Sequence, residues 1–156
     1  MFDIVLYQPE IPPNTGNIIR LCANTGCRLH LVEPLGFDLN DKKLRRAGLD
    51  YHEWADIKVH PDLTSACNRP GKIYAVSTRG TRLYTDARLQ AGDTLVFGPE
   101  TRGLPQDYLN TLDQNRILRI PMLANSRSLN LSNAVAVLVY EGLRQNNFST
   151  IRGDLG

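Results

Sequence analysis

Cysteine is scarce in this chain, and its spacing suits neither pairing nor metal binding. The 156 residues include three cysteines, Cys22, Cys27 and Cys67. An odd number of cysteines without a CxxC pair argues against both a disulfide framework and a zinc site. We therefore expect reduced thiols in a cytoplasmic protein.

Long apolar runs are also missing. The longest run, 134–140, is far shorter than the ~20 residues that a membrane-spanning helix needs. The first residues, 1–7, carry an acid at Asp3 and no basic cluster, unlike a secretory signal. We expect neither a membrane span nor a leader peptide.

The common nucleotide-binding and hydrolytic motifs do not occur. Gly98 and Gly103 have the spacing of a phosphate loop, but Leu104-Pro105 stands where Lys and Ser/Thr should follow. There is no GxGxxG after the first expected strand and no GxSxG. The segment 52–56 begins like a zinc-protease motif but ends in Asp, and the three histidines lack ligand spacing. We expect no metal. A small-molecule α/β enzyme would need a catalytic His, Cys or metal set, and the sequence shows none.

The charge balance leaves nucleic acid open as a partner. The formal charge is +2, with 42% apolar and 22% charged residues, as in an ordinary globular domain. The densest basic cluster lies near Tyr51 and Trp54, which suits phosphate contacts and base stacking. The alternative is a solvated helix face. The cluster consists of Lys42, Lys43, Arg45 and Arg46.

Apolar periodicity predicts alternating strands and helices. This order favours one α/β domain with a mostly parallel sheet flanked by helices. Strands are expected at 3–7, 27–32, 57–59, 72–77, 94–97 and 116–120, and helices at 18–25, 41–47, 63–68 and 131–144. The tail after Asn146 has no assignment.

The last expected helix is apolar on more than one face, because residues 134–139 are consecutively apolar. Such a helix is buried on several sides. A second copy of the chain is one natural partner, which would give a two-fold homodimer. The alternative is a central core helix in a monomer.

Two expected strands end in polar turns rich in Gly, Pro, Asn and Ser, at 97–104 and at 120–135. Loops at strand ends are where α/β sheets build cofactor pockets. Taken singly, Gly98 and Pro99 could merely turn the chain, and Ser128 or Ser132 could merely cap a helix.

Three ordered segments, 12–20, 98–103 and 120–134, resemble the SPOUT superfamily of S-adenosylmethionine-dependent methyltransferases, and the resemblance runs from Met1 to about Arg144. Segments 5–7, 24–26 and 44–51 resemble its minimal members. Those enzymes are homodimers that methylate the ribose 2′-hydroxyl of the tRNA wobble nucleotide, position 34, a cytidine or modified uridine. The resemblance implies leucine tRNA isoacceptors as substrates.

The resemblance implies one SPOUT domain over 1–156, with a C-terminal deep trefoil knot over roughly 73–145 that holds S-adenosyl-L-methionine. The resemblance also implies Arg20 as the catalytic residue. A guanidinium stays protonated in proteins, so we favour an electrostatic stabiliser and phosphate clamp over a base; a surface salt bridge is the alternative. The implied cofactor residues are Val76, Gly98, Ile120, Met122, Ser128 and Leu129. The implied substrate residues are Asn14, Arg46, Glu100, Arg102 and Asn133.

Other functions remain open from the sequence. A relative could methylate another tRNA position or ribosomal RNA, and a non-catalytic RNA-binding protein could keep the same fold. The absence of an added RNA-binding domain favours a small target such as an anticodon loop.

Overall fold

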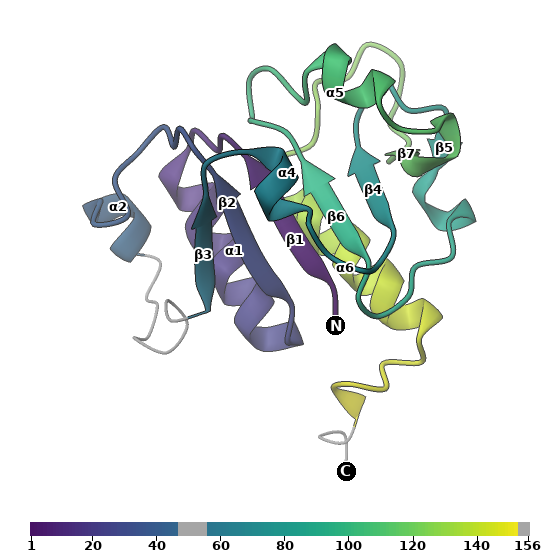
Figure 1. The fold of residues 1–156 in the computed structure, drawn as a ribbon, viewed down its shortest axis with the longest axis horizontal. Helices are drawn as coiled ribbons and strands as arrows, with labels where there is room; N and C mark the ends of the chain where they lie inside the picture. Colours follow the sequence, from purple (N-terminus) through teal and green to yellow (C-terminus); the bar gives the residue numbers. More distant parts are fainter. Residues whose placement is uncertain (47–55, 153–156) are drawn as a thin grey trace.

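The computed structural model describes residues 1–46 and 56–152, and within them seven strands form one sheet (Figure 1). The strand order is β3-β2-β1-β6-β4-β7-β5, and every pairing is parallel. The strands are β1 (Asp3–Tyr7), β2 (Arg28–Val32), β3 (Ile57–His60), β4 (Ile73–Val76), β5 (Arg82–Leu83), β6 (Thr94–Phe97) and β7 (Ile117–Arg119). This confirms the predicted α/β class with a mostly parallel sheet.

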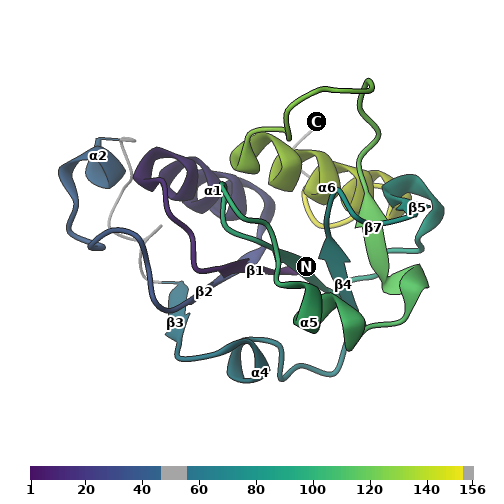
Figure 2. The same ribbon diagram turned by 90° about the horizontal axis from the view of Figure 1, so that it is seen from above.

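Helices cover both faces of the sheet (Figure 2). The long helices α1 and α6 lie on one face, and the short helices α4 and α5 lie on the other. The helices are α1 (Pro12–Thr25), α2 (Lys42–Arg45), α4 (Leu63–Ala66), α5 (Gln106–Asn110) and α6 (Leu131–Gln145), with short 3-10 turns η1 (Tyr84–Asp86) and η2 (Gln114–Arg116). None of these helices is long and apolar enough to span a membrane.

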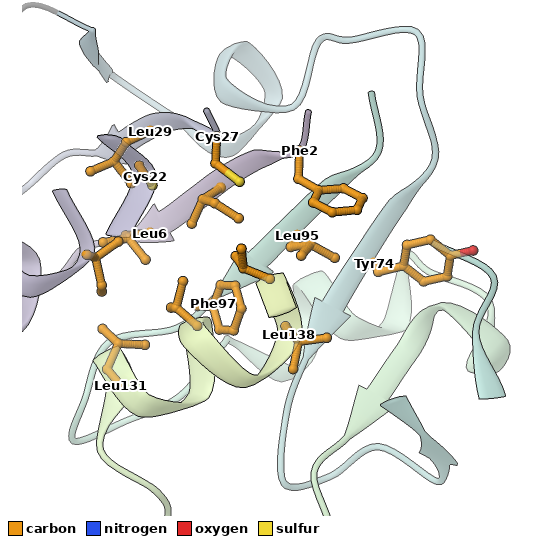
Figure 3. Packing of buried hydrophobic residues seen from close by; sticks show 14 of the residues in the cluster. Phe2, Leu6, Cys22, Cys27, Leu29, Tyr74, Leu95, Phe97, Leu131 and Leu138 are labelled. Carbon is orange, nitrogen blue, oxygen red and sulfur yellow. The ribbon is translucent and has the colours of Figure 1, made fainter. Parts of the chain in front are cut away.

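The alternation of side chains along β1 divides the core into two layers. Ile4 and Leu6 pack toward α1 and α6, whereas Val5 packs toward α4 and α5. Figure 3 shows Phe97 of β6 and Leu138 of α6 within the larger layer. Both faces of the single sheet are covered by helices, so a binding site is expected at the ends of the strands.

Helix α1 begins earlier than predicted. The expected start is residue 18, but the helix begins at Pro12; it ends at Thr25 and is capped by Gly26, whose φ is 76°. Pro9, Pro12 and Pro13 follow the first strand and are typical of a strand end. Proline is also well tolerated in the first helical turn, because the N–H it lacks has no partner there. The helix therefore reaches the edge of the sheet where the loops gather.

Other predicted boundaries were wrong by one or two residues. Strands at 27–32, 57–59, 72–77 and 116–120 became β2, β3, β4 and β7, the helix at 63–68 is the shorter α4, and that at 131–144 extends by one residue as α6. The helix at 41–47 is α2, and its last predicted residue lies outside the described residues. The short elements β5, η1, α5 and η2 were missed because so few residues show no periodicity.

Candidate functional site

A cavity of about 630 Å³ lies where the carboxyl ends of β4, β6 and β7 run into loops. Its volume falls in the range of small-molecule and cofactor sites. Four separate segments line it: Ile11 and Asn14 at the start of α1, residues 76–79, residues 97–103, and residues 120–134 in part. In a parallel sheet this edge is the expected place for a ligand.

All six residues predicted to bind the cofactor line this one cavity. They come from three segments: Val76 after β4, Gly98 after β6, and the group after β7. That group comprises Ile120, Met122, Ser128 and Leu129. The structure thus brings the predicted residues together, and their part in cofactor binding stays a prediction.

Gly98 leaves no room for a side chain. A Cβ atom on Gly98 would overlap the backbone of Gly103 and Leu104, which fold back over it. Backbone can move aside only by shifting the whole 98–104 loop. The glycine therefore allows this loop to close tightly at the end of β6.

Three of the five predicted substrate residues, Asn14, Glu100 and Arg102, line the cavity, but their polar atoms already have protein partners. The Oδ1 atom of Asn14 accepts a hydrogen bond from Nδ2 of Asn130 at 2.9 Å. Both carboxylate oxygens of Glu100 accept backbone N–H groups, those of Glu10 and Ile11. Arg102 donates to the side chain of Gln8 at 3.1 Å. These residues shape the site as well as face it.

Arg20, Arg46 and Asn133 are not part of the cavity lining. Arg20 is half-buried on α1, about 9 Å along the helix axis from Asn14 at 1.5 Å per residue. Asn133 lies in the first turn of α6, where its N–H reaches Oδ1 of Asn130 at 3.4 Å. Arg46 is exposed just after α2, and the nearby Tyr51 and Trp54 lie outside the described residues.

Asn130 was not among the predicted site residues, yet it joins two parts of the site. Its Oδ1 accepts from Ser132 N at 2.9 Å and so caps α6, while its Nδ2 bonds to Asn14. An Asn directly before the first apolar residue of a helix could have signalled the cap. The bond to Asn14 spans 116 residues and has no local signal.

The segment Ser77-Thr78-Arg79 was also missed, although it follows β4 just as Gly98 follows β6. Arg79 donates to Gln106 Oε1 at 2.8 Å and to the carbonyl of Leu104. It thereby ties the loop after β4 to the loop after β6. Applying the strand-end rule to every strand would have found it.

The lining offers apolar groups, main-chain atoms and a few polar side chains. Among the described residues that line it, the charged ones are Arg79, Glu100 and Arg102, with no His, Cys or Lys. Across residues 1–46 and 56–152, no group of three or more His, Cys, Asp or Glu could hold a metal ion. Such a lining can hold and orient a ligand, but its carboxylate, Glu100, is occupied as an acceptor.

Known proteins similar to this chain act on RNA. A family model described as the SpoU rRNA Methylase family matches residues 1–140. The tRNA (cytidine(34)-2'-O)-methyltransferase of Saccharophagus degradans is 58% identical over 151 residues, covering 96% of this chain and 98% of that protein.

Solved structures share the fold. One that concerns 2-OH methylation of C/U34 on tRNA has a TM-score of 0.86 and 46% identity, and covers 95% of this chain and 97% of the other. The SpoU methyltransferase AviRb from Streptomyces viridochromogenes, in complex with AdoMet, has a TM-score of 0.78 at 24% identity, covering 93% and 57%. That last likeness shows the fold alone. The family model matches most of this chain, and the relatives are highly identical to it over nearly their whole length. This chain therefore belongs to the SpoU methylase family.

Proposed function

We propose that this protein transfers a methyl group from S-adenosyl-L-methionine to the ribose 2′-hydroxyl of the wobble nucleotide, position 34, of tRNA. The observation that carries the proposal is the meeting of three distant segments, 76–79, 97–103 and 120–134, at one cavity. The Saccharophagus degradans relative named for this reaction at cytidine 34 aligns over almost the whole chain. Leucine isoacceptors with cytidine or modified uridine at that position are the proposed substrates.

The cavity suits S-adenosyl-L-methionine rather than a nucleoside triphosphate. When bound, this cofactor supplies an electrophilic methyl group on a sulfonium. Ile120 and Leu129 offer apolar contacts, and the backbone at Gly98 and Ser128 offers main-chain polar groups. The described lining contains no lysine to cradle a triphosphate.

The residues of this chain would orient the 2′-hydroxyl and stabilise its charge. The oxygen must approach the methyl carbon in line with the bond that breaks, and orientation can contribute roughly 7–11 kcal/mol in the best intramolecular cases. Arg20 supplies a permanent positive charge for the developing alkoxide and for a nearby phosphate. It does not take the proton.

We propose a two-fold homodimer, which the surface of α6 and the position of Arg20 support. The buried face of α6 packs on the sheet, yet Tyr140 of the same helix is 46% exposed. Leu129, 41% exposed, lies just before the helix. A second copy packed here would cover these residues and could bring Arg20 of one chain to the cavity of the other.

We also propose one domain over 1–156 in which residues 73–145 form a deep trefoil knot. The end of α6 is bound to an earlier loop: Gln145 bonds to the backbone of Ala87 and Leu89, and Asn146 donates to the carbonyl of Leu89 at 2.9 Å. These bonds hold α6 against the chain that it would thread. As a tRNA-modifying enzyme, the protein would act in the cytoplasm.

The direct test is methyl transfer from labelled S-adenosylmethionine to total bacterial tRNA, with the product mapped by nucleotide. We expect label on the ribose of nucleotide 34 in leucine tRNAs. Label on ribosomal RNA or another tRNA position would overturn the proposed target, and no transfer to any RNA would overturn the activity.

The role of Arg20 and of the dimer can be tested together. Arg20→Ala should bind the cofactor normally but lose methyl transfer by at least about 100-fold. Mixing it with a cofactor-binding variant, Gly98→Val, should restore about a quarter of wild-type activity, since half of the dimers would hold one intact shared site. Failure of the mixed, co-refolded sample to recover activity would contradict shared sites.

A further inference from the structure

Two loops beside the cavity are joined by hydrogen bonds, in which a carboxylate of each loop accepts N–H groups of the other. Strands β1 and β6 are parallel neighbours, so the loops that follow them leave the same edge of the sheet side by side (Figure 1). Glu100 accepts the N–H of Glu10 at 2.7 Å and that of Ile11 at 3.2 Å. In return, Glu10 accepts the N–H of Thr101 at 2.9 Å and its hydroxyl at 2.8 Å. We name these four residues, Glu10, Ile11, Glu100 and Thr101, the cross-loop clasp.

Glu100 acts as a cap for α1 from 90 residues away in the chain. The N-cap residue of α1, Ile11, makes no side-chain cap bond, and Pro12 begins the helix. The two N–H groups that Glu100 accepts precede this first turn directly. A carboxylate is favoured there by the helix dipole, and it pairs the N–H groups of Glu10 and Ile11.

Glu10 remains a carboxylate at neutral pH. Hydrogen bonds from the backbone N–H and then the hydroxyl of Thr101, with the nearby charge of Arg102, hold the pKa of Glu10 below its usual range. Arg102 is itself held by the side chain of Gln8, whose φ of 48° is unusual for a residue other than glycine. A backbone held in this region needs support from its surroundings.

The clasp connects three walls of the cavity. Glu10 and Thr101 join the loop after β6 to the start of α1. A few residues further along the chain, Asn14 joins α1 to Asn130, the cap of α6. The wall that contains Gly98 is therefore fixed relative to the start of α1 and, through Asn14, to the start of α6.

We propose that Glu10 is a positioning residue for methyl transfer: through Thr101 it holds the 98–103 loop in the form that binds the cofactor, in register with α1. This inference rests on the proposed function for the identity of the ligand. Glu100, predicted as a substrate residue, serves the same clasp with both of its oxygens.

The test measures S-adenosylmethionine binding by calorimetry, without RNA. Glu10→Ala removes both acceptors and should raise the Kd about tenfold, the scale of one charge-assisted hydrogen bond. Glu10→Gln keeps an acceptor for the Thr101 N–H and should recover most of the affinity. Glu10→Ala combined with Thr101→Val should bind no worse than Glu10→Ala alone, since both changes break one contact.

A matched control is Asp113→Ala, an exposed acid remote from the lining that makes no side-chain cap bond. It should leave the Kd unchanged. A Glu10→Ala protein with a lowered melting temperature but wild-type Kd would show a purely structural contact and overturn the proposal. If that variant does not fold, Glu10→Asp decides in its place, because it withdraws the carboxylate by one methylene from the N–H and hydroxyl of Thr101: an unchanged Kd overturns the proposal, and a raised Kd supports it.

The assay separates this proposal from the proposed function. Wild-type protein that binds the cofactor but methylates no tRNA would overturn the function, while the Kd comparison still decides the clasp. Wild-type protein that does not bind S-adenosylmethionine would overturn both.

Discussion

The two ends of the sheet differ in where their polar and charged groups lie. At the carboxyl end, the cavity is lined by loops whose polar groups pair with each other across long sequence distances, as Asn14 does with Asn130. At the amino end, Asp3 of β1 is fully buried and binds His30 at 2.8 Å and Arg28 at 2.6 Å. The first end has space and exposed polar groups; the second has buried charge.

A chain of hydrogen bonds links Asp3 to His30 and continues to Arg69 and His60. Arg69 can only donate, so Nδ1 of His30, 3.1 Å away, must accept and Nε2–H must donate to Asp3. Nε2 of His60 lies 2.9 Å from the same Nδ1. This partly buried chain of side chains has the form of a catalytic relay.

A buried charge relay does not by itself mark a site. Neither the large cavity nor a second one of about 300 Å³ is lined by Asp3, His30 or His60. Burial alone would raise the pKa of Asp3, but hydrogen bonds from His30 and Arg28 and the charge of Arg28 hold it below its usual range. We expect changes at the carboxyl end to alter binding and changes at the amino end to alter stability.

The largest expected effect is on cofactor binding in Gly98→Val. The added side chain would collide with the backbone of Gly103 and Leu104 and displace the loop, so we expect the Kd for S-adenosylmethionine to rise by at least about 100-fold. The control is Gly26→Asn, because Gly26 has open space around it and Asn tolerates its positive φ. Tight binding by Gly98→Val would remove this loop from the site.

The next effect is on stability at the other end of the sheet. Asp3→Asn leaves Arg28 and His30 without their carboxylate and should lower the free energy of unfolding by about 3 kcal/mol, or Tm by roughly 6–12 °C. The cofactor Kd should not change. Arg144→Gln, which breaks the exposed pair with Glu141, should cost less than about 1 kcal/mol. An altered Kd in Asp3→Asn would break the separation between the two ends.

A smaller effect concerns pH. Burial, and then the neighbouring His30, Arg69 and Lys58, lowers the pKa of His60 from 6.5. The unfolded chain therefore takes up this proton first, so stability present above pH 6.5 should decline as pH falls through the folded pKa. His60→Gln should remove this decline in the free energy of unfolding, measured in urea from about pH 7.5 to about pH 5. The loss of stability that comes from protonation of Asp3, below pH 3.8, should remain. An unchanged pH profile would contradict the assignment.

The smallest effect is on RNA affinity, at the basic residues beside α2. Charge reversal of Lys42 and Arg46, both outside the buried core, should lower the slope of log K against log salt by about 1 for each phosphate that the variant no longer binds. Cofactor binding should stay normal. Filter binding of tRNA at several salt concentrations measures the slope, and an unaltered slope would assign these residues to a solvated face.

The sequence predicted the parallel sheet and the edge that holds the cavity because both depend on local patterns. Strand β6 was predicted at its observed bounds, 94–97, from a short apolar run ended by Gly98-Pro99. The start of α1 was not, because Pro12 and Pro13 signal a strand end and a first helical turn equally well.

The lining residues could be predicted from strand ends and family likeness, but their mutual bonds could not. Glu10 accepts hydrogen bonds from Thr101, 91 residues further along the chain, and no spacing in the sequence predicts such a pair. The pairing depends on β1 and β6 being neighbours, which is a property of the sheet order. The same holds for the bond from Asp3 to His30, which joins different strands.

The most direct test of this account is a crystal structure of the protein with S-adenosylmethionine. The account predicts the cofactor in the cavity at the carboxyl ends of β4, β6 and β7, in contact with Gly98, Ile120 and Ser128, with the Glu10–Thr101 bonds intact. A cofactor bound elsewhere, or one that binds only after these two loops separate, would contradict it.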